Sequence, residues 1–141
     1  MRLPEIRQAL ADRIGAVSGV NSAYDVPPNQ LGTLPCGVVF HDPDATNDIT
    51  MGDSEMWTHR LMVRLYIAPV KNIPNELAQA DGFIEPFVAE IAGHYQLGVS
   101  GVYGAPVTGY RVGTAEYGGT AYVVAEWLVA VKAKQARSIA A

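Results

Sequence analysis

The sequence predicts an α+β fold in which a mainly antiparallel sheet carries two principal helices. Helix-like spacing of apolar residues occurs twice, near the N-terminus and after Pro74, and period-two alternation marks strands between and after them. The order of helix, strands, helix and hairpin is typical of this fold class. Since 141 residues lie within the size range of one domain, we expect a single domain over residues 1–133 and a short C-terminal tail over residues 134–141.

The first helix is predicted at the N-terminus. Pro4 and Glu5 suit a first helical turn, and Gly19 is a natural stop. Spacings of three and four place the apolar residues on one face, which makes the helix amphipathic. These residues are Leu3, Ile6, Leu10, Ile14 and Val17.

Three strands are predicted before the second helix. A short one is expected in SAYDV and a buried one in CGVVF, on either side of the turn-rich stretch VPPNQLGTLP. The third, MWTHRLMVRLYIA, is the clearest strand because it alternates with period two. Its alternation predicts that Trp57, His59, Leu61, Val63, Leu65 and Ile67 face one way and Thr58, Arg60, Met62, Arg64 and Tyr66 the other.

The second half of the chain combines a helix with a hairpin. The helical pattern starts at Pro74, and Pro86 inside it predicts a kink or two abutting segments, because proline lacks the amide hydrogen and its ring crowds the preceding turn. The glycine-rich LGVSGVYGAP then leads to strands in VTGYRVGT and TAYVVAEWLVAVKA, joined through EYGG. The apolar residues of the helical pattern are Leu77, Ala80, Ile84, Phe87, Val88, Ile91 and Tyr95.

The two faces of the last strand differ in polarity. One is continuously apolar from Ala121 to Val131, whereas the other is only half polar. If both helices cover the same face of the sheet, the opposite face displays aromatic, methionine and arginine side chains, a composition that resembles a protein interface. The alternative places one helix on each face. The candidate subunit interface consists of Arg60, Met62, Arg64, Tyr66, Tyr122 and Leu128.

An acidic segment, HDPDATNDITMGDSE, lies between two apolar runs. It holds five of the fourteen carboxylates and no lysine or arginine, so it carries a formal charge of −5 in a chain whose net charge is −4. We expect this segment to be a displayed interaction loop. Its acidic residues are Asp42, Asp44, Asp48, Asp53 and Glu55.

Metal binding and catalysis find little support in the sequence. A calcium loop read from Asp42 has Asn47 where glycine is needed and Asp53 where glutamate is needed. A transition-metal site could use His41 with Asp42 or Asp44, and His59, but no fixed ligand spacing supports it. There is no glycine-flanked serine on a strand-to-helix turn. We therefore expect no catalytic residues, no metal site and no cofactor, and keep a small metal-dependent enzyme as the least favoured alternative.

Composition restricts the partners. Only 17% of residues are charged, against about 25% in typical soluble domains, which suggests that another chain covers some apolar surface. No apolar run reaches the roughly 18 residues that span a bilayer, so no membrane is expected. The sequence pI of about 5.2 argues against tight binding to the outside of nucleic acid but allows a passage for it.

Cys36, within LPCGVVF, is expected to be a buried structural thiol.

The order of these elements and the tract DVPPNQLGTLPCGVVF resemble a tail terminator, or tail completion, protein of long-tailed, siphovirus-like bacteriophages. The similarity covers residues 1–133 and includes WTHRLMVRLYIAP, FIEPFVAEIAGHY and VVAEWLVAVKA. It implies a structural virion protein, not an enzyme, that forms a hexameric ring on the last layer of the tail tube. Such a ring ends tube polymerisation and provides the surface for head–tail joining.

The same resemblance implies the partners and the location. The partners are further copies of the chain, the tail tube protein, a head–tail connector or stopper protein, and DNA that passes through the lumen without sequence-specific binding. The location is the head-proximal end of the virion tail, and the host cytoplasm during assembly. The acidic segment is expected in the lumen or between rings, where carboxylates repel DNA phosphates at short range. Another neck protein, a head–tail adaptor or stopper, is the alternative.

Overall fold

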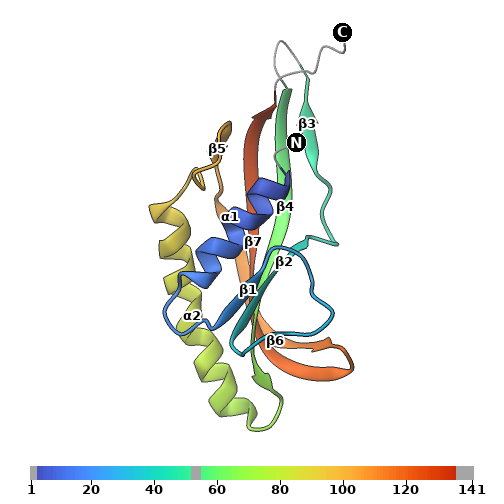
Figure 1. The fold of residues 1–141 in the computed structure, drawn as a ribbon, viewed down its shortest axis with the longest axis vertical. Helices are drawn as coiled ribbons and strands as arrows, with labels where there is room; N and C mark the ends of the chain where they lie inside the picture. Colours follow the sequence, from blue (N-terminus) through green and yellow to red (C-terminus); the bar gives the residue numbers. More distant parts are fainter. Residues whose placement is uncertain (1–2, 52–54, 136–141) are drawn as a thin grey trace.

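Two helices and a seven-stranded sheet make up the computed structural model, which describes residues 3–51 and 55–135 (Figure 1). In chain order the elements are α1 (Leu3–Gly15), β1 (Ser22–Tyr24), β2 (Cys36–His41), β3 (Asp48–Thr50), β4 (Glu55–Pro69), α2 (Ile73–Gly93), β5 (Val102–Gly104), β6 (Val107–Tyr117) and β7 (Thr120–Gln135). The strand order is β1-β2-β4-β7-β5, with β3 also paired to β4 and β6 also paired to β7. Every pairing is antiparallel except β1 with β2, which confirms the predicted α+β class.

The long strands β4 and β7 form the centre of the sheet. They pair from Glu55 opposite Gln135 to Pro69 opposite Tyr122, with a register shift between Tyr66 and Ala68. The predicted alternation of β4 is confirmed, because its apolar odd-numbered residues from Leu61 to Ile67 lie in the main core and the intervening side chains do not. This pairing sets which side chains share each face of the sheet.

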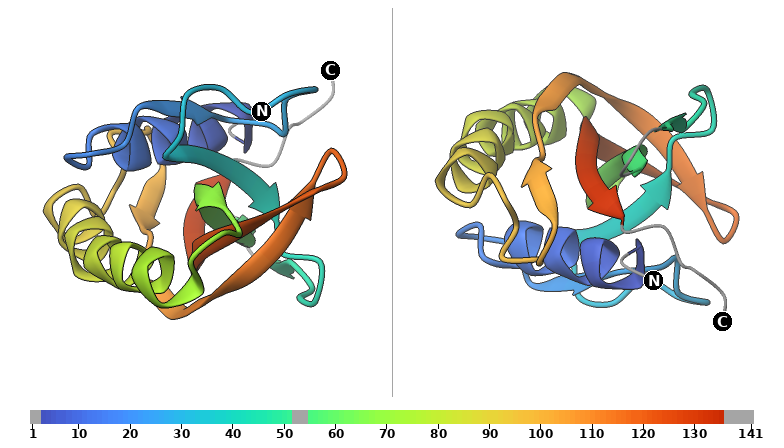
Figure 2. Two further views of the ribbon diagram at one scale, coloured as in Figure 1. Left: turned by 90° about the horizontal axis from the view of Figure 1, so that it is seen from below. Right: turned by 90° about the horizontal axis from the view of Figure 1, so that it is seen from above.

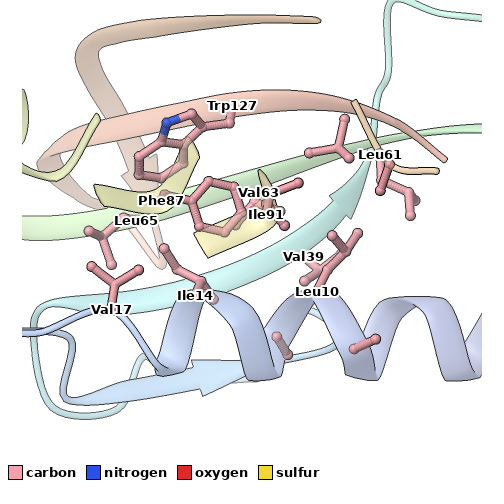
Figure 3. Packing of buried hydrophobic residues seen from close by; sticks show 14 of the residues in the cluster. Leu10, Ile14, Val17, Val39, Leu61, Val63, Leu65, Phe87, Ile91 and Trp127 are labelled. Carbon is pink, nitrogen blue, oxygen red and sulfur yellow. The ribbon is translucent and has the colours of Figure 1, made fainter. Parts of the chain in front are cut away.

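Both helices cover the same face of the sheet (Figure 2). The sequence left two arrangements open, and the one with both helices on the same face is the one observed, in place of one helix on each face. Phe87 of α2 packs against Trp127 of β7, with ring centroids 4.6 Å apart, and the indole nitrogen donates a hydrogen bond to the carbonyl of Ile84. Side chains from both helices and from β2, β4 and β7 meet in this core (Figure 3). Burial of one such large apolar side chain contributes about 1.5 to 3 kcal/mol.

Helix α2 continues without a break through Pro86. Of the two outcomes expected at Pro86, a kink or two abutting segments, the second does not occur. Pro86 and Gly82, four residues earlier, both lie on the exposed side of the helix, where solvent can hydrate the carbonyl that loses its amide partner. Pro74 stands at the first turn of α2, as predicted. Helix α1 ends at Gly15, and a turn follows to Gly19, which has a positive φ of 94°.

The hairpin between β6 and β7 is confirmed. Tyr117 pairs with Thr120, and the two residues between them, Gly118 and Gly119, have φ values of 59° and 85°. Positive φ at both central residues is the requirement of a two-residue type I′ turn, which glycine meets without strain. Strands β3 and β5, three residues each, were not predicted, because they lie inside the acidic segment and the glycine-rich stretch.

A second, smaller cluster lies on the face away from the helices. Cys36 is fully buried there, as expected of a structural thiol, together with Val38, Tyr66 and Val124. The hydroxyl of Tyr117 donates a hydrogen bond to the carbonyl of Pro28, so the tip of the β6–β7 hairpin curls back towards the segment before β2 (Figure 2).

Among the described residues, no helix combines the length and apolar character needed to span a membrane.

Candidate functional site

Part of the acidic segment, expected to be a displayed interaction loop, pairs as β3 with the start of β4 and forms an arm at one end of the sheet (Figure 1). Asp48 pairs with Thr58 across the arm, and Glu55 begins β4. Asp42 and Asp44 lie in the connection between β2 and β3, and Asp53 lies outside the described residues. Asp48 and Glu55, predicted in a loop, are thus on strands. The segment from Asp48 pairs with the first residues of β4, which β2 does not reach.

Arg60 holds this arm together. Its guanidinium lies 2.7 Å from the carboxylate of Asp48 and donates a hydrogen bond to the carbonyl of Thr46, and its backbone amide donates to Oδ1 of Asn47 at 2.8 Å. Elsewhere in the arm, Glu55 accepts a hydrogen bond from the indole of Trp57 at 3.0 Å. Within the described part of the arm, Asp48 and Glu55 thus bond to different side chains, Arg60 and Trp57.

No metal centre forms among the described residues, which contain no group of three or more histidine, cysteine, aspartate or glutamate side chains able to hold an ion. The ring of His41 makes a hydrogen bond with the guanidinium of Arg7, a cation that disfavours metal binding at the same nitrogen. Burial, and then Arg7, lower the pKa of His41. The least favoured sequence alternative, a metal site of His41 with Asp42 or Asp44, and His59, thus has no matching ligand group among the described residues.

His59 is buried near His41, on the helix side of β4. Only 3% of the residue is exposed, its ring lies 5.7 Å from that of Trp57, and its Nε2 atom has no hydrogen-bond partner among the described residues. Burial lowers the pKa of His59, and the nearby His41 lowers it further. This environment stabilises a neutral imidazole.

The six residues of the candidate subunit interface all lie on the face without helices, which we call the helix-free face. Met62 and Tyr66 are 3% and 0% exposed, and the Tyr66 ring packs edge-on against Tyr117 of the curled hairpin and against Tyr122. Arg60, Arg64, Tyr122 and Leu128 are half-buried. A partner would therefore meet these four side chains, with Met62 and Tyr66 beneath them.

A charged network crosses the helix-free face between three strands. Glu126 of β7 accepts hydrogen bonds from the Nε atoms of Arg64 on β4, at 2.7 Å, and of Arg111 on β6. The Arg64 guanidinium also lies 5.2 Å from the centre of the Phe40 ring. Burial opposes the charge of Arg64, but its hydrogen bonds to Tyr66 and Glu126 outweigh that effect and raise its pKa. The sequence indicates polar residues here but not this pairing, which depends on the strand register.

Comparison with known proteins adds no identification, since no protein-family model and no curated protein matches this sequence. The case for function consequently depends on the fold, on the helix-free face and on the acidic arm.

Proposed function

We propose that this chain is a structural virion protein that forms a ring, expected to be hexameric, at the end of the tail tube of a long-tailed bacteriophage. As a tail terminator it ends polymerisation of the tail tube protein and offers a surface to the head–tail connector or stopper. It acts by binding its partners and carries out no catalysis.

The observation that supports this proposal best is the placement of both helices on one face of a curled sheet. The opposite face carries arginine, tyrosine and leucine side chains that are half-buried in the isolated chain. Aromatic and arginine side chains are enriched at protein interfaces, and a rotational ring needs two different patches on every subunit. The helix-free face is a candidate for one of these patches.

We further propose that the acidic arm faces the passage for DNA or the adjoining ring. Asp42 is half-buried and Asp44 is exposed in the connection to β3, at the end of the sheet (Figure 1). Carboxylates around a passage repel DNA phosphates within about 8 to 10 Å at physiological salt, so DNA moves through without adhering. The double variant Asp42→Asn/Asp44→Asn should therefore assemble normally but retain DNA in a gel-shift measurement.

The deciding experiment follows polymerisation of the cognate tail tube protein by electron microscopy with and without this protein. A terminator shortens the tubes in proportion to its amount and forms a ring at one end of each tube. Full-length polymerisation with the protein bound to neck components would instead support the adaptor or stopper alternative. Absence of both interactions would contradict a role in the tail.

A further inference from the structure

The two halves of helix α1 are held to the rest of the fold by different polar contacts. In the C-terminal half, Arg13 pairs with the carboxylate of Glu90 on α2 at 2.7 Å. In the N-terminal half, the guanidinium of Arg7 meets the ring of His41, the last residue of β2. Among the described residues, Arg7 has no carboxylate partner. One half of α1 therefore depends on an ion pair and the other on a histidine.

The contact between Arg7 and His41 requires a neutral imidazole. A guanidinium only donates hydrogen bonds, so the Nε2 atom of His41 is the acceptor and the ring proton lies on Nδ1. A second proton would occupy Nε2, remove the acceptor and place a cation against the Arg7 guanidinium. The hydrogen bond that ties the first turns of α1 to β2 therefore exists only while His41 is unprotonated.

The buried His59 lies near this contact, on the same side of the sheet. Its Nε2 atom has no hydrogen-bond partner among the described residues. Helix α1 passes over this side, where Leu10 packs into the core (Figure 3), and the strand register places the apolar Val131 of β7 opposite His59. A proton on His59 would therefore add a poorly solvated cation close to Arg7 and His41. The charged and titratable groups on this side are Arg7 from α1, His41 from β2, and His59 and Glu55 from β4, of which Glu55 bonds to the Trp57 indole.

We propose that Arg7, His41 and His59 form a pH-sensitive latch, in which protonation of the two histidines releases the N-terminal half of α1 from the sheet. In the latched state both imidazoles are neutral, whereas in the released state both bind protons in contact with water. The released state thus takes up protons, so a fall in pH favours it. The C-terminal half stays bound through the ion pair of Arg13 with Glu90. The latch belongs to the single folded chain and is independent of the proposed ring.

Hydrogen exchange of the α1 amides at about pH 7.5 and about pH 5, on either side of the ordinary histidine pKa, tests the latch. After correction for the intrinsic exchange rate, protection of residues 7–10 should be about tenfold lower at the acid pH, with little change at residues 13–15. His41→Gln keeps an acceptor for Arg7 but cannot become a cation, so it should lose most of this response, and adding His59→Phe should remove the rest. Arg7→Ala should lower the protection of residues 7–10 already at the higher pH.

His94→Gln is the matched control, because His94 follows α2 outside the latch and its side chain is 51% exposed. This variant should keep the wild-type acid response, and circular dichroism should show every variant folded at both pH values. Equal protection of residues 7–10 at the two pH values in wild type would overturn the latch. The same holds if His41→Gln responds as strongly as wild type. An equal loss of protection throughout α1 and at Val63 in β4 would also overturn it, because the opening would then be global.

Discussion

The Nε atom of Arg64 lies 2.7 Å from Oε2 of Glu126, across the pairing of β4 with β7. Glu126 also accepts a hydrogen bond from Arg111 of β6, so one carboxylate links three strands. The side chains of Arg64 and Glu126 are 19% and 8% exposed, whereas that of Arg111 is 61% exposed. Water therefore stabilises Arg111 far better than Arg64 when the carboxylate is absent.

Removal of the Glu126 carboxylate should destabilise the protein more than removal of the exposed Arg111 guanidinium. Glu126→Ala leaves the Arg64 charge in a poorly solvated position, and we expect a loss of about 2 to 3 kcal/mol in the free energy of unfolding, somewhat less than for a fully buried pair. Arg111→Ala breaks a largely exposed ion pair and should cost under about 1 kcal/mol. Urea denaturation of the two variants checks this order. Equal losses would show that the buried position of Arg64 is not important.

Helix α1 approaches β2 closely at Gly37. A Cβ atom placed there would lie 2.8 Å from Cγ2 of Ile14. Gly37→Ala should therefore destabilise the fold by about 1 to 3 kcal/mol through overpacking. Ile14→Ala removes both crowding γ carbons, so Gly37→Ala should cost less when it is added to Ile14→Ala than when it is added to wild type. Gly82→Ala is the matched control, because no atom lies within 4 Å of the added methyl in the exposed middle of α2. That control should stabilise the protein by about 0.5 to 1 kcal/mol, measured by the same denaturation.

The buried His59 should make stability depend on pH. Its folded-state pKa lies below the ordinary value of 6.5, so the unfolded chain binds the proton more readily than the folded one. The free energy of unfolding should be highest above pH 6.5 and decrease as the pH falls through the folded-state pKa. His41 acts in the same direction. Denaturation across this range should show a smaller decrease for His59→Phe than for wild type, and an unchanged profile would contradict the assignment.

The fold was more predictable from sequence than the candidate site. Alternation in β4 and helical spacing in α1 depend on residues close in the chain, so the sequence indicates these elements directly. The link from Arg64 and Arg111 to Glu126 depends on the register between strands, which no local pattern specifies. Burial of Tyr66 likewise depends on the curl of the hairpin, held by Tyr117, and so the strand pattern overestimated the exposed interface.

The acidic arm should loosen when Arg60 is removed. The guanidinium of Arg60 bonds to the carboxylate of Asp48 and to the carbonyl of Thr46. Because the side chains of Arg60 and Asp48 are 35% and 60% exposed, their ion pair itself contributes under about 1 kcal/mol. In Arg60→Ala we therefore expect a small change in global stability but faster hydrogen exchange at β3, by about three- to tenfold, because the lost carbonyl bond adds to the lost ion pair. Amides in the centre of β4, such as Val63, should keep their protection. Uniform acceleration across β4 would mean that the arm and the core open together, and that Arg60 stabilises the whole sheet.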